Sequence, residues 1–243
     1  MNIHAGCCGF PRSQAEYHGL LSVVEIQQTF YKMPRLDTVQ RWRQQAPPGF
    51  EFVIKAWQLI THPSSSPTYR QPGLLLDGPL EAYGSFQANQ YILDAWTRTR
   101  DVALALKASI VLFQCPPSFE PNAASVNNLV RFFSQVDRGG LMMAWEVRGD
   151  WPVKLVQGLC REMKLLYAVD PFVQPDPNSG TAYYRLNGKT GYGYRFTDRD
   201  LGLLRKWCAG RPEAYCLFSN VSMLEDALRL KAMVAEEATT AAE

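Results

Sequence analysis

Short apolar runs alternate with amphipathic segments along almost the whole chain. Several of these runs, such as residues 110–113, are continuously apolar and rich in β-branched and aromatic residues. Strands buried on both faces of a parallel sheet have this composition. The pattern predicts eight strands, at residues 2–7, 23–30, 51–57, 109–115, 141–147, 165–170, 181–187 and 214–218.

Amphipathic helical segments separate most of these strands, and they are predicted at residues 37–45, 85–107, 122–135, 153–163, 197–207 and 222–234. Eight strands with intervening helices in 243 residues predict an α/β fold, a TIM-type (β/α)8 barrel. A doubly wound sheet is the alternative, but the first strand is not followed by the G-x-G-x-x-G turn that a dinucleotide-binding sheet of that kind carries.

Two segments depart from this regular pattern. Residues 171–180 contain three prolines, so we expect the sixth helix to be missing or replaced by a loop. Residues 61–84 are rich in Ser, Pro and Gly, and they predict a long loop after the third strand that acts as a lid. We expect a single barrel domain over residues 1–234 and a frayed tail over residues 235–243.

Composition and charge exclude several classes of protein. The formal net charge is +2, which is not that of a polycation, and no apolar run approaches the length of about 20 residues that spans a bilayer. The start of the chain lacks the pattern of a secretory signal, so we expect a cytoplasmic protein without a membrane partner. Three scattered histidines and six cysteines without a C-x-x-C pair predict no zinc site, no other metal site and no cofactor.

Charged and amide side chains occupy one alternating face of several predicted strands. Because the apolar face of each strand should meet the helices, we expect the charged face to point into the barrel. The residues are Glu25 and Gln27 in the second strand, Lys55 and Trp57 in the third, Gln114 in the fourth, Glu146 and Arg148 in the fifth, Asp170 in the sixth, and Arg185 and Asn187 in the seventh.

Buried charges must pair with one another or meet a ligand. One interpretation is a self-neutralising salt-bridge network that fills the barrel. The other is a substrate site at the carboxyl ends of the strands, where barrel enzymes keep their chemistry. In the second case Glu25, Lys55, Glu146, Asp170 and His62 are the catalytic candidates, and the remaining polar residues of these strands, with Trp57, bind substrate.

These residues favour an enzyme that needs no metal and acts on a phosphorylated or polyhydroxylated, sugar- or nucleotide-like substrate. Paired carboxylates supply acid–base chemistry and arginines hold an anion, while hydrolysis, isomerisation and lyase chemistry all stay open. The alternative is a non-catalytic nucleic-acid-binding protein. Its basic aromatic loops at residues 69–70 and 192–195 would stack on bases and contact the backbone.

Several short motifs resemble those of one family, the YecE-like family, also called domain of unknown function 72. The similar segments run from Gly6 to about Lys231. They include Gly-Cys-Cys-Gly-Phe at 6–10, Val-Glu-Ile-Gln-Gln-Thr-Phe-Tyr at 24–31, Pro-Pro-Gly-Phe-Glu-Phe at 47–52, Phe-Gln-Cys-Pro-Pro-Ser-Phe at 113–119, Glu-Val-Arg at 146–148 and Tyr-Arg-Leu-Asn-Gly at 184–188.

The resemblance implies a barrel fold and no established activity. It adds Asn220 to the candidate substrate-binding residues, because Phe-Ser-Asn at 218–220 stands where the family has Phe-Asn-Asn. The chain departs from the family pattern at Gln27, Ser219 and Gly149. It also lacks the many histidines that a multi-zinc nuclease would need.

Overall fold

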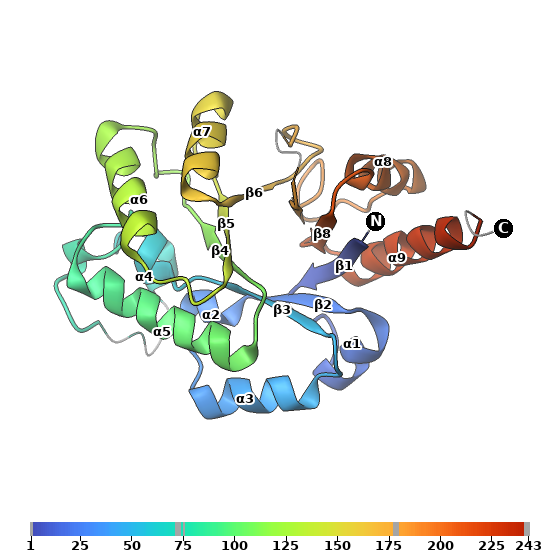
Figure 1. Ribbon diagram of the computed structural model, residues 1–243, viewed down its shortest axis with the longest axis horizontal. Helices are drawn as coiled ribbons and strands as arrows, with labels where there is room; N and C mark the ends of the chain where they lie inside the picture. The colour runs from blue at the N-terminus through green and yellow to red at the C-terminus, as the bar shows by residue number, and fades with distance from the viewer. Residues whose placement is uncertain (1, 71–73, 75, 177–179, 241–243) are drawn as a thin grey trace. The chain divides into compact units, whose positions relative to one another are not determined.

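The structure is a computed structural model that describes residues 2–70, 74, 76–176 and 180–240. Its eight parallel strands form a closed barrel in the order β1 to β8. Figure 1 labels most of these strands and the helices that follow them. The strands are β1 Asn2–Cys8, β2 Val23–Ile26, β3 Glu51–Lys55, β4 Ile110–Gln114, β5 Met142–Glu146, β6 Leu166–Val169, β7 Ala182–Leu186 and β8 Glu213–Phe218.

Helices follow most of the strands. They are α1 Gln14–Leu20, α2 Gln28–Tyr31, α3 Leu36–Gln45, α4 Gln58–Thr61, α5 Gln90–Leu106, α6 Ala123–Gln135, α7 Val153–Met163, α8 Asp198–Cys208 and α9 Met223–Thr240, with 3-10 turns η1 at Pro67–Arg70 and η2 at Leu80–Ala82. No helix in the described ranges has both the length and the hydropathy that crossing a bilayer requires.

The chain divides into two compact units. The first comprises Met1–Glu25, Ala46–Glu51 and Tyr167–Glu243, and the second comprises Ile26–Gln45 and Phe52–Leu166. In the first unit, β8 pairs in parallel with both β1 and β7, so that Leu217 is the register partner of Gly6 and of Arg185. Helix α9 packs against β1, β8 and α8.

The buried Tyr17 side chain of α1 joins β1 to β2. Its hydroxyl accepts a hydrogen bond from the Cys7 backbone N–H at 2.8 Å and donates one to the Val23 carbonyl, also at 2.8 Å. Burial raises the pKa of this phenol, so the hydroxyl keeps the proton that it donates. One side chain therefore satisfies a backbone donor and a backbone acceptor on neighbouring strands.

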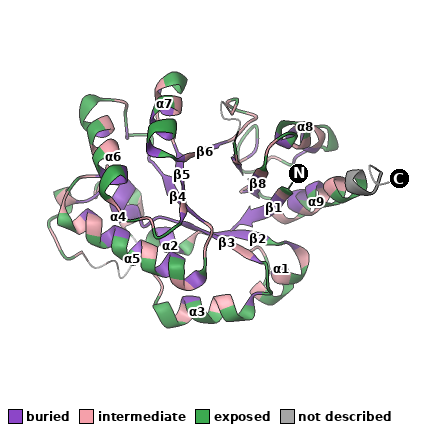
Figure 2. Ribbon diagram, viewed as in Figure 1, coloured by how far each residue is buried: buried purple, intermediate pink, exposed green. Residues whose placement is uncertain are grey.

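An aromatic core holds the second unit together. The ring of Phe113, in β4, contacts the rings of Phe132 and Phe133 in α6 and of Trp96 in α5. The phenyl ring of Phe86 joins the same cluster. In Figure 2 the strands are mostly purple, which marks buried residues. The helices show both buried and exposed residues along their length.

The helix-facing position of Phe113 fixes the orientation of β4. Since side chains alternate along a strand, the next residue, Gln114, lies on the opposite face. The prediction that apolar side chains meet the helices while polar ones occupy the other face therefore holds for this strand.

The segment after β2 differs from the prediction. A strand was expected over residues 23–30, but β2 ends at Ile26 and the chain turns into the short helix α2. The Thr29 hydroxyl donates to the Ile26 carbonyl at 3.2 Å and to the Lys55 carbonyl at 2.8 Å. The first bond is local and offers the backbone an alternative to the strand ladder. The second joins α2 to the end of β3.

Three other segments show where the helix boundaries lie. Helix α5 starts at Gln90 rather than residue 85, because Ser85 and Phe86 have positive φ and Asn89 caps the helix. Between β6 and β7, none of the described residues 170–176 and 180–181 is helical. Helix α9 continues to Thr240, so residues 235–240 of the expected tail are helical, and residues 241–243 lie outside the described residues.

Candidate functional site

Three polar residues end three consecutive strands of the second unit. Lys55 is the last residue of β3, Gln114 of β4 and Glu146 of β5. Gln114 and Glu146 are register partners, which places their side chains next to each other on one face. All three side chains are buried. The strand-end position is where barrel proteins carry their chemistry.

These three side chains form one hydrogen-bonded series. Lys55 Nζ donates to Gln114 Oε1 at 2.9 Å, and Gln114 Nε2 donates to Glu146 Oε2 at 2.6 Å. An ammonium group has only donors and a carboxylate has only acceptors, so an amide with one of each is suited to join them. Gln114 thereby fixes the rotamers of an acid and a base on either side of it.

Arg148 lies beyond the end of β5 and holds the other oxygen of the same carboxylate. Its Nε donates to Glu146 Oε1 at 3.2 Å, and its side chain is 45% exposed. Within the described residues, the two Nη groups of Arg148 make no hydrogen bond. The side chain is therefore anchored at one end by a buried carboxylate and presents two cationic donors to an incoming group.

His62 follows α4 and is buried in the same unit. Burial, together with the positive charges of Lys55 and Arg148, lowers its pKa from 6.5 to about 4. The imidazole is therefore neutral at pH 7, with Nδ1 in a hydrogen bond with the Thr61 hydroxyl at 2.8 Å. Two cationic side chains, Lys55 and Arg148, therefore act on this ring.

Phe30 belongs to this group, and the sequence analysis missed it. Lys55 Nζ lies 4.3 Å from the centroid of the Phe30 ring, which itself contacts the His62 ring edge to face at 4.8 Å. An aromatic face stabilises a partly desolvated ammonium group. The alternation of polar and apolar residues breaks at Gln27 and Gln28, where α2 begins. This break was the signal in the sequence that the strand ends before Phe30.

A second group of polar residues lies in the first unit. The Arg185 guanidinium donates from Nε to Glu25 Oε2 and from Nη2 to Glu25 Oε1, both at 3.0 Å. The Tyr183 hydroxyl donates to the same carboxylate at 2.7 Å. Burial and the Glu25 charge raise the pKa of Tyr183, which stays protonated. This geometry is the internal salt bridge of our alternative interpretation, and it engages Arg185 with protein rather than leaving its fork for an anion.

Asp170 and Asn187 meet at the carboxyl ends of β6 and β7. Asp170 Oδ2 accepts the Asn187 backbone N–H at 3.1 Å, and Oδ1 accepts that of Phe172 at 3.0 Å. The Asn187 side chain donates to the Arg185 carbonyl at 3.3 Å. The carboxylate thus holds the turn after β6 and the end of β7 in place.

Asn220 and Gln27 have local roles. The buried Asn220 amide donates to the Tyr194 carbonyl and to Asp226 Oδ2, both at 2.7 Å, which orders the loop after β7 against the start of α9. Gln27 occupies the N-cap position of α2 without a capping bond from its side chain.

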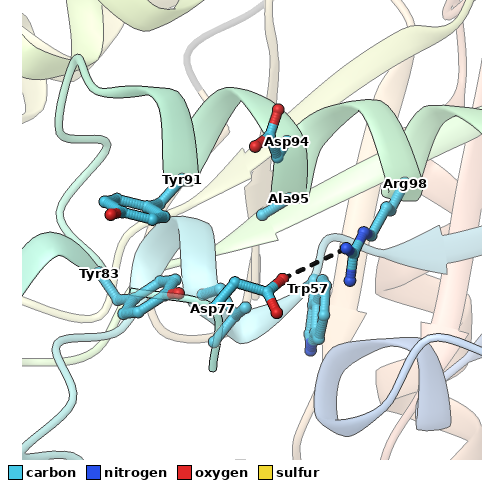
Figure 3. A pocket seen from close by; sticks show the side chains of 8 residues that line it. Trp57, Asp77, Tyr83, Tyr91, Asp94, Ala95 and Arg98 are labelled. Carbon is cyan, nitrogen blue, oxygen red and sulfur yellow. Dashed lines mark hydrogen bonds and ion pairs between the residues drawn. The ribbon is translucent and has the colours of Figure 1, made fainter. Parts of the chain in front are cut away.

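Trp57 lines a different cavity, of about 70 Å³. Figure 3 shows it with Tyr83, Tyr91 and the ion pair of Asp77 and Arg98, whose closest atoms lie 3.3 Å apart. Lys55 ends β3, so the strand alternation that predicted a common face for Lys55 and Trp57 does not reach Trp57. The cavity residues come from the segment after β3 and from α5.

The basic aromatic loop after β7 is held to its own unit. Lys189 Nζ donates to Asp200 Oδ1, and the Tyr194 hydroxyl donates to Asp200 Oδ2 at 2.7 Å. Although burial opposes it, hydrogen bonds from Lys189, Tyr194 and Thr197 hold the Asp200 pKa below its ordinary range. Lys189 is thereby engaged by a carboxylate, whereas Tyr192 is exposed.

Within the described ranges, no three residues among His, Cys, Asp and Glu lie close enough together to hold a metal ion. All six cysteines are free thiols and buried.

Comparison with known proteins gives a family match over nearly the whole chain. The sequence pattern of the family described as "Protein of unknown function DUF72" matches residues 11–243. No curated protein matches the chain.

Solved structures with a similar fold include two DUF72 family proteins. One, from Enterococcus faecalis V583, is 20% identical, with 96% of this chain and 98% of that chain covered and a TM-score of 0.73. The other, from Thermotoga maritima MSB8, is 16% identical, with 97% and 100% covered and a TM-score of 0.70.

A xylose isomerase domain containing protein from Salmonella typhimurium LT2 is 12% identical, with 100% of both chains covered and a TM-score of 0.58. At these identities the likenesses concern the fold, and they confirm the predicted barrel.

Proposed function

The chain belongs to the DUF72 family of proteins of unknown function, and from its own residues we propose that it is an enzyme. It acts by side-chain acid–base chemistry on a phosphorylated or polyhydroxylated substrate at the carboxyl ends of β3, β4 and β5. The observation that carries this proposal is Arg148, which is anchored through Nε to the buried Glu146 while its Nη groups meet no described protein acceptor.

An anionic group on the substrate binds to the free edge of the Arg148 guanidinium. Arginine matches the oxygens of phosphate in a bidentate manner, and bonds of this kind between charged groups are among the stronger hydrogen bonds in proteins. The positive charges of Lys55 and Arg148, which both act on His62, favour the same ligand charge. Sugar phosphates and nucleotides are the compounds that combine an anion with the hydroxyls that a carboxylate and an amide recognise.

Glu146 is the proposed general acid–base group. Its carboxylate is oriented by Gln114 on one oxygen and by Arg148 on the other, so its position is fixed before substrate arrives. The neutral His62 imidazole can donate or accept one hydrogen bond to a substrate hydroxyl. Lys55 holds the amide of Gln114 and adds positive charge.

A thermal-shift screen with sugar phosphates and nucleotides tests the binding half of the proposal. A compound present at 100 times its dissociation constant should add about 2.7 kcal/mol to the unfolding free energy, which corresponds to a rise in Tm of roughly 5–10 °C. Arg148→Ala should lose the shift, and Arg131→Ala, a matched change of an exposed arginine in α6, should keep it. A shift unchanged in Arg148→Ala would assign the anion to another site.

We propose that the reaction uses no bound transition metal and that the protein works in the cytoplasm. Six buried free thiols agree with a reducing compartment. Elemental analysis of the purified protein tests the first statement, and near-stoichiometric zinc or iron that is lost together with activity on chelation would contradict it.

A further inference from the structure

One ring nitrogen of His62 is bonded to the protein, and the other is left over. Its Nδ1 forms a hydrogen bond with the Thr61 hydroxyl at 2.8 Å. Within the described ranges, Nε2 has no hydrogen-bond partner, and His62 keeps 7% of its surface exposed. What this residue can do for a substrate therefore depends on which of the two nitrogens carries the proton.

The Thr61 side chain determines where that proton lies. Thr61 is 1% exposed, and Nδ1 of His62 is the sole acceptor that its hydroxyl meets among the described residues. If Nδ1 carried the proton, the ring would donate to the hydroxyl, and the hydroxyl proton would be buried without an acceptor, which is costly. The hydroxyl therefore donates to Nδ1, and the proton of the neutral ring lies on Nε2.

The imidazole is held in place from several sides. The backbone N–H of His62 donates to the Gln58 carbonyl at 2.8 Å, and its carbonyl accepts from the Tyr69 hydroxyl at 2.9 Å. The Phe30 ring contacts the imidazole edge to face, with the centroids 4.8 Å apart. An N–H group fixed in this way is a preorganised hydrogen-bond donor.

The charge state of His62 limits the chemistry in which it can take part. Burial and the charges of Lys55 and Arg148 lower its pKa to about 4, so at neutral pH the ring is not an imidazolium that could protonate a leaving group. Its protonated Nε2 has no lone pair with which to take a proton from a substrate. The ring therefore serves as a hydrogen-bond donor, and the substrate atom that it meets is an acceptor.

We propose that the Nε2–H group of His62 binds the carbonyl oxygen of the substrate and that the reaction removes a proton from the carbon next to that carbonyl. This inference rests on the proposed function, in which Glu146 is the acid–base group. It narrows the substrate class to phosphorylated sugars with an aldehyde or ketone group.

The proposed step is a proton transfer to Glu146. Its carboxylate takes the proton from the carbon, the C–H electron pair forms the C=C bond of an enolate, and the carbonyl π electrons move to the oxygen, where His62 Nε2–H stabilises the negative charge. The protonated Glu146 then returns a proton to the same carbon, and the carbonyl forms again. Thr61 is a positioning residue, because it sets the tautomer of His62 without contacting the substrate.

The surroundings of His62 favour this step. Lys55 and Arg148 both act on the ring electrostatically, so they also stabilise negative charge on an oxygen bound to Nε2. Glu146 is 6% exposed and His62 is 7% exposed, so neither is closed off from a substrate. A carboxylate base combined with a neutral imidazole donor is an established arrangement for reactions that pass through an enolate.

Long-range ¹H–¹⁵N correlation spectra of the intact protein at pH 7.5 test the tautomer without any substrate. His62 Nε2 should have the chemical shift of a protonated ring nitrogen, and Nδ1 that of an unprotonated one. Thr61→Val removes the hydroxyl and should produce a mixture of both tautomers, whereas Thr61→Ser should restore the Nε2–H form. Thr97→Val, at an exposed position of α5, should leave the spectrum unchanged.

Hydrogen exchange in D₂O tests the reaction. Ribulose 5-phosphate, fructose 6-phosphate and dihydroxyacetone phosphate serve as probes, and ¹H NMR follows the signals of the carbon next to the carbonyl. The protein should catalyse exchange in at least one of them. His62→Phe should slow that exchange by about 10²–10³-fold, as expected for the loss of a donor to the developing oxyanion. Thr61→Val should slow it less, and Thr61→Ser should restore it.

Three results would overturn the proposal. The first is an Nδ1-protonated His62 in the parent protein, and the second is exchange at the parent rate in His62→Phe. The third is probes that raise Tm through Arg148 without any exchange, in which case anion binding holds and the reaction assigned here is wrong. Probes that neither bind nor exchange would contradict the proposed function as well. If His62→Phe does not fold, the comparison of Thr61→Val with Thr61→Ser decides.

Discussion

Gln114 and Glu146 are direct register partners in neighbouring strands, and the amide of the first donates to the carboxylate of the second at 2.6 Å. The same amide accepts from Lys55, so its loss leaves a buried acceptor and a buried donor each with one partner fewer.

Gln114→Leu should therefore destabilise the protein by about 1–3 kcal/mol, the usual effect of removing a hydrogen-bond partner from a buried polar group. Urea unfolding measures the change. Gln135→Leu, at an exposed position of α6, is the matched control and should change stability by less than about 0.5 kcal/mol. Equal stability of the two variants would show that the amide does not hold the site together.

Glu146→Gln should lower the turnover of whichever phosphorylated compound proves to be the substrate by about 10²–10⁴-fold, because an amide neither accepts nor releases the proton. Steady-state kinetics gives the ratio. Glu162→Gln, an exposed change in α7, should leave turnover unchanged. Full activity of Glu146→Gln would show that this carboxylate is not the general acid–base group. It would not contradict the proposed anion site at Arg148.

The pH dependence of stability should carry the signature of His62. Its pKa is about 4 in the folded protein and 6.5 ordinarily, so below pH 6.5 the unfolded chain takes up a proton that the folded protein does not. The contribution of the neutral ring is complete above pH 6.5 and is lost as the pH falls toward 4.

The stability of the parent protein relative to His62→Gln should thus fall by about 2 kcal/mol between pH 7 and pH 4.5. Urea unfolding of both proteins at each pH measures this difference, and taking the difference cancels the titration of other groups. A difference that stays constant over this range would mean that the ring is as easily protonated in the folded protein as in the unfolded chain.

Replacing one member of the Glu25–Arg185 ion pair should lower the free energy of unfolding far more than replacing both. Glu25→Leu leaves a buried guanidinium without its bidentate partner and should cost about 3–5 kcal/mol. The double variant Glu25→Leu/Arg185→Met should cost much less than the sum of the two single changes. Additive effects in this double-mutant cycle would show that the two side chains are stabilised by other contacts.

The sequence was sufficient to predict the barrel and part of the site. Strands buried on both faces are apolar throughout, so they stand out in the chain, and alternation within strands placed Lys55, Gln114 and Glu146 on one face. Those three residues are in fact hydrogen-bonded in series. This success depends only on local periodicity.

What the sequence could not provide is long-range pairing. Arg185 lies 160 residues from Glu25 in the chain. The sequence around either residue does not indicate that the guanidinium group binds that carboxylate. Phe30 was missed because β2 ends at Ile26 and the side chains that follow are oriented by the helix α2. The alternation of side chains along a strand also fails to place Trp57, because Trp57 lies past the last residue of β3.

The Tyr17 hydroxyl that joins Cys7 to Val23 has a consequence for the order of folding. All three residues lie within a segment of 17, so the first strand, first helix and second strand can associate through short loop closures. Contacts of low sequence separation form fast. We expect this βαβ segment to be an early structured region of the chain, and pulsed hydrogen exchange should show the Cys7 amide protected before the amides of β8.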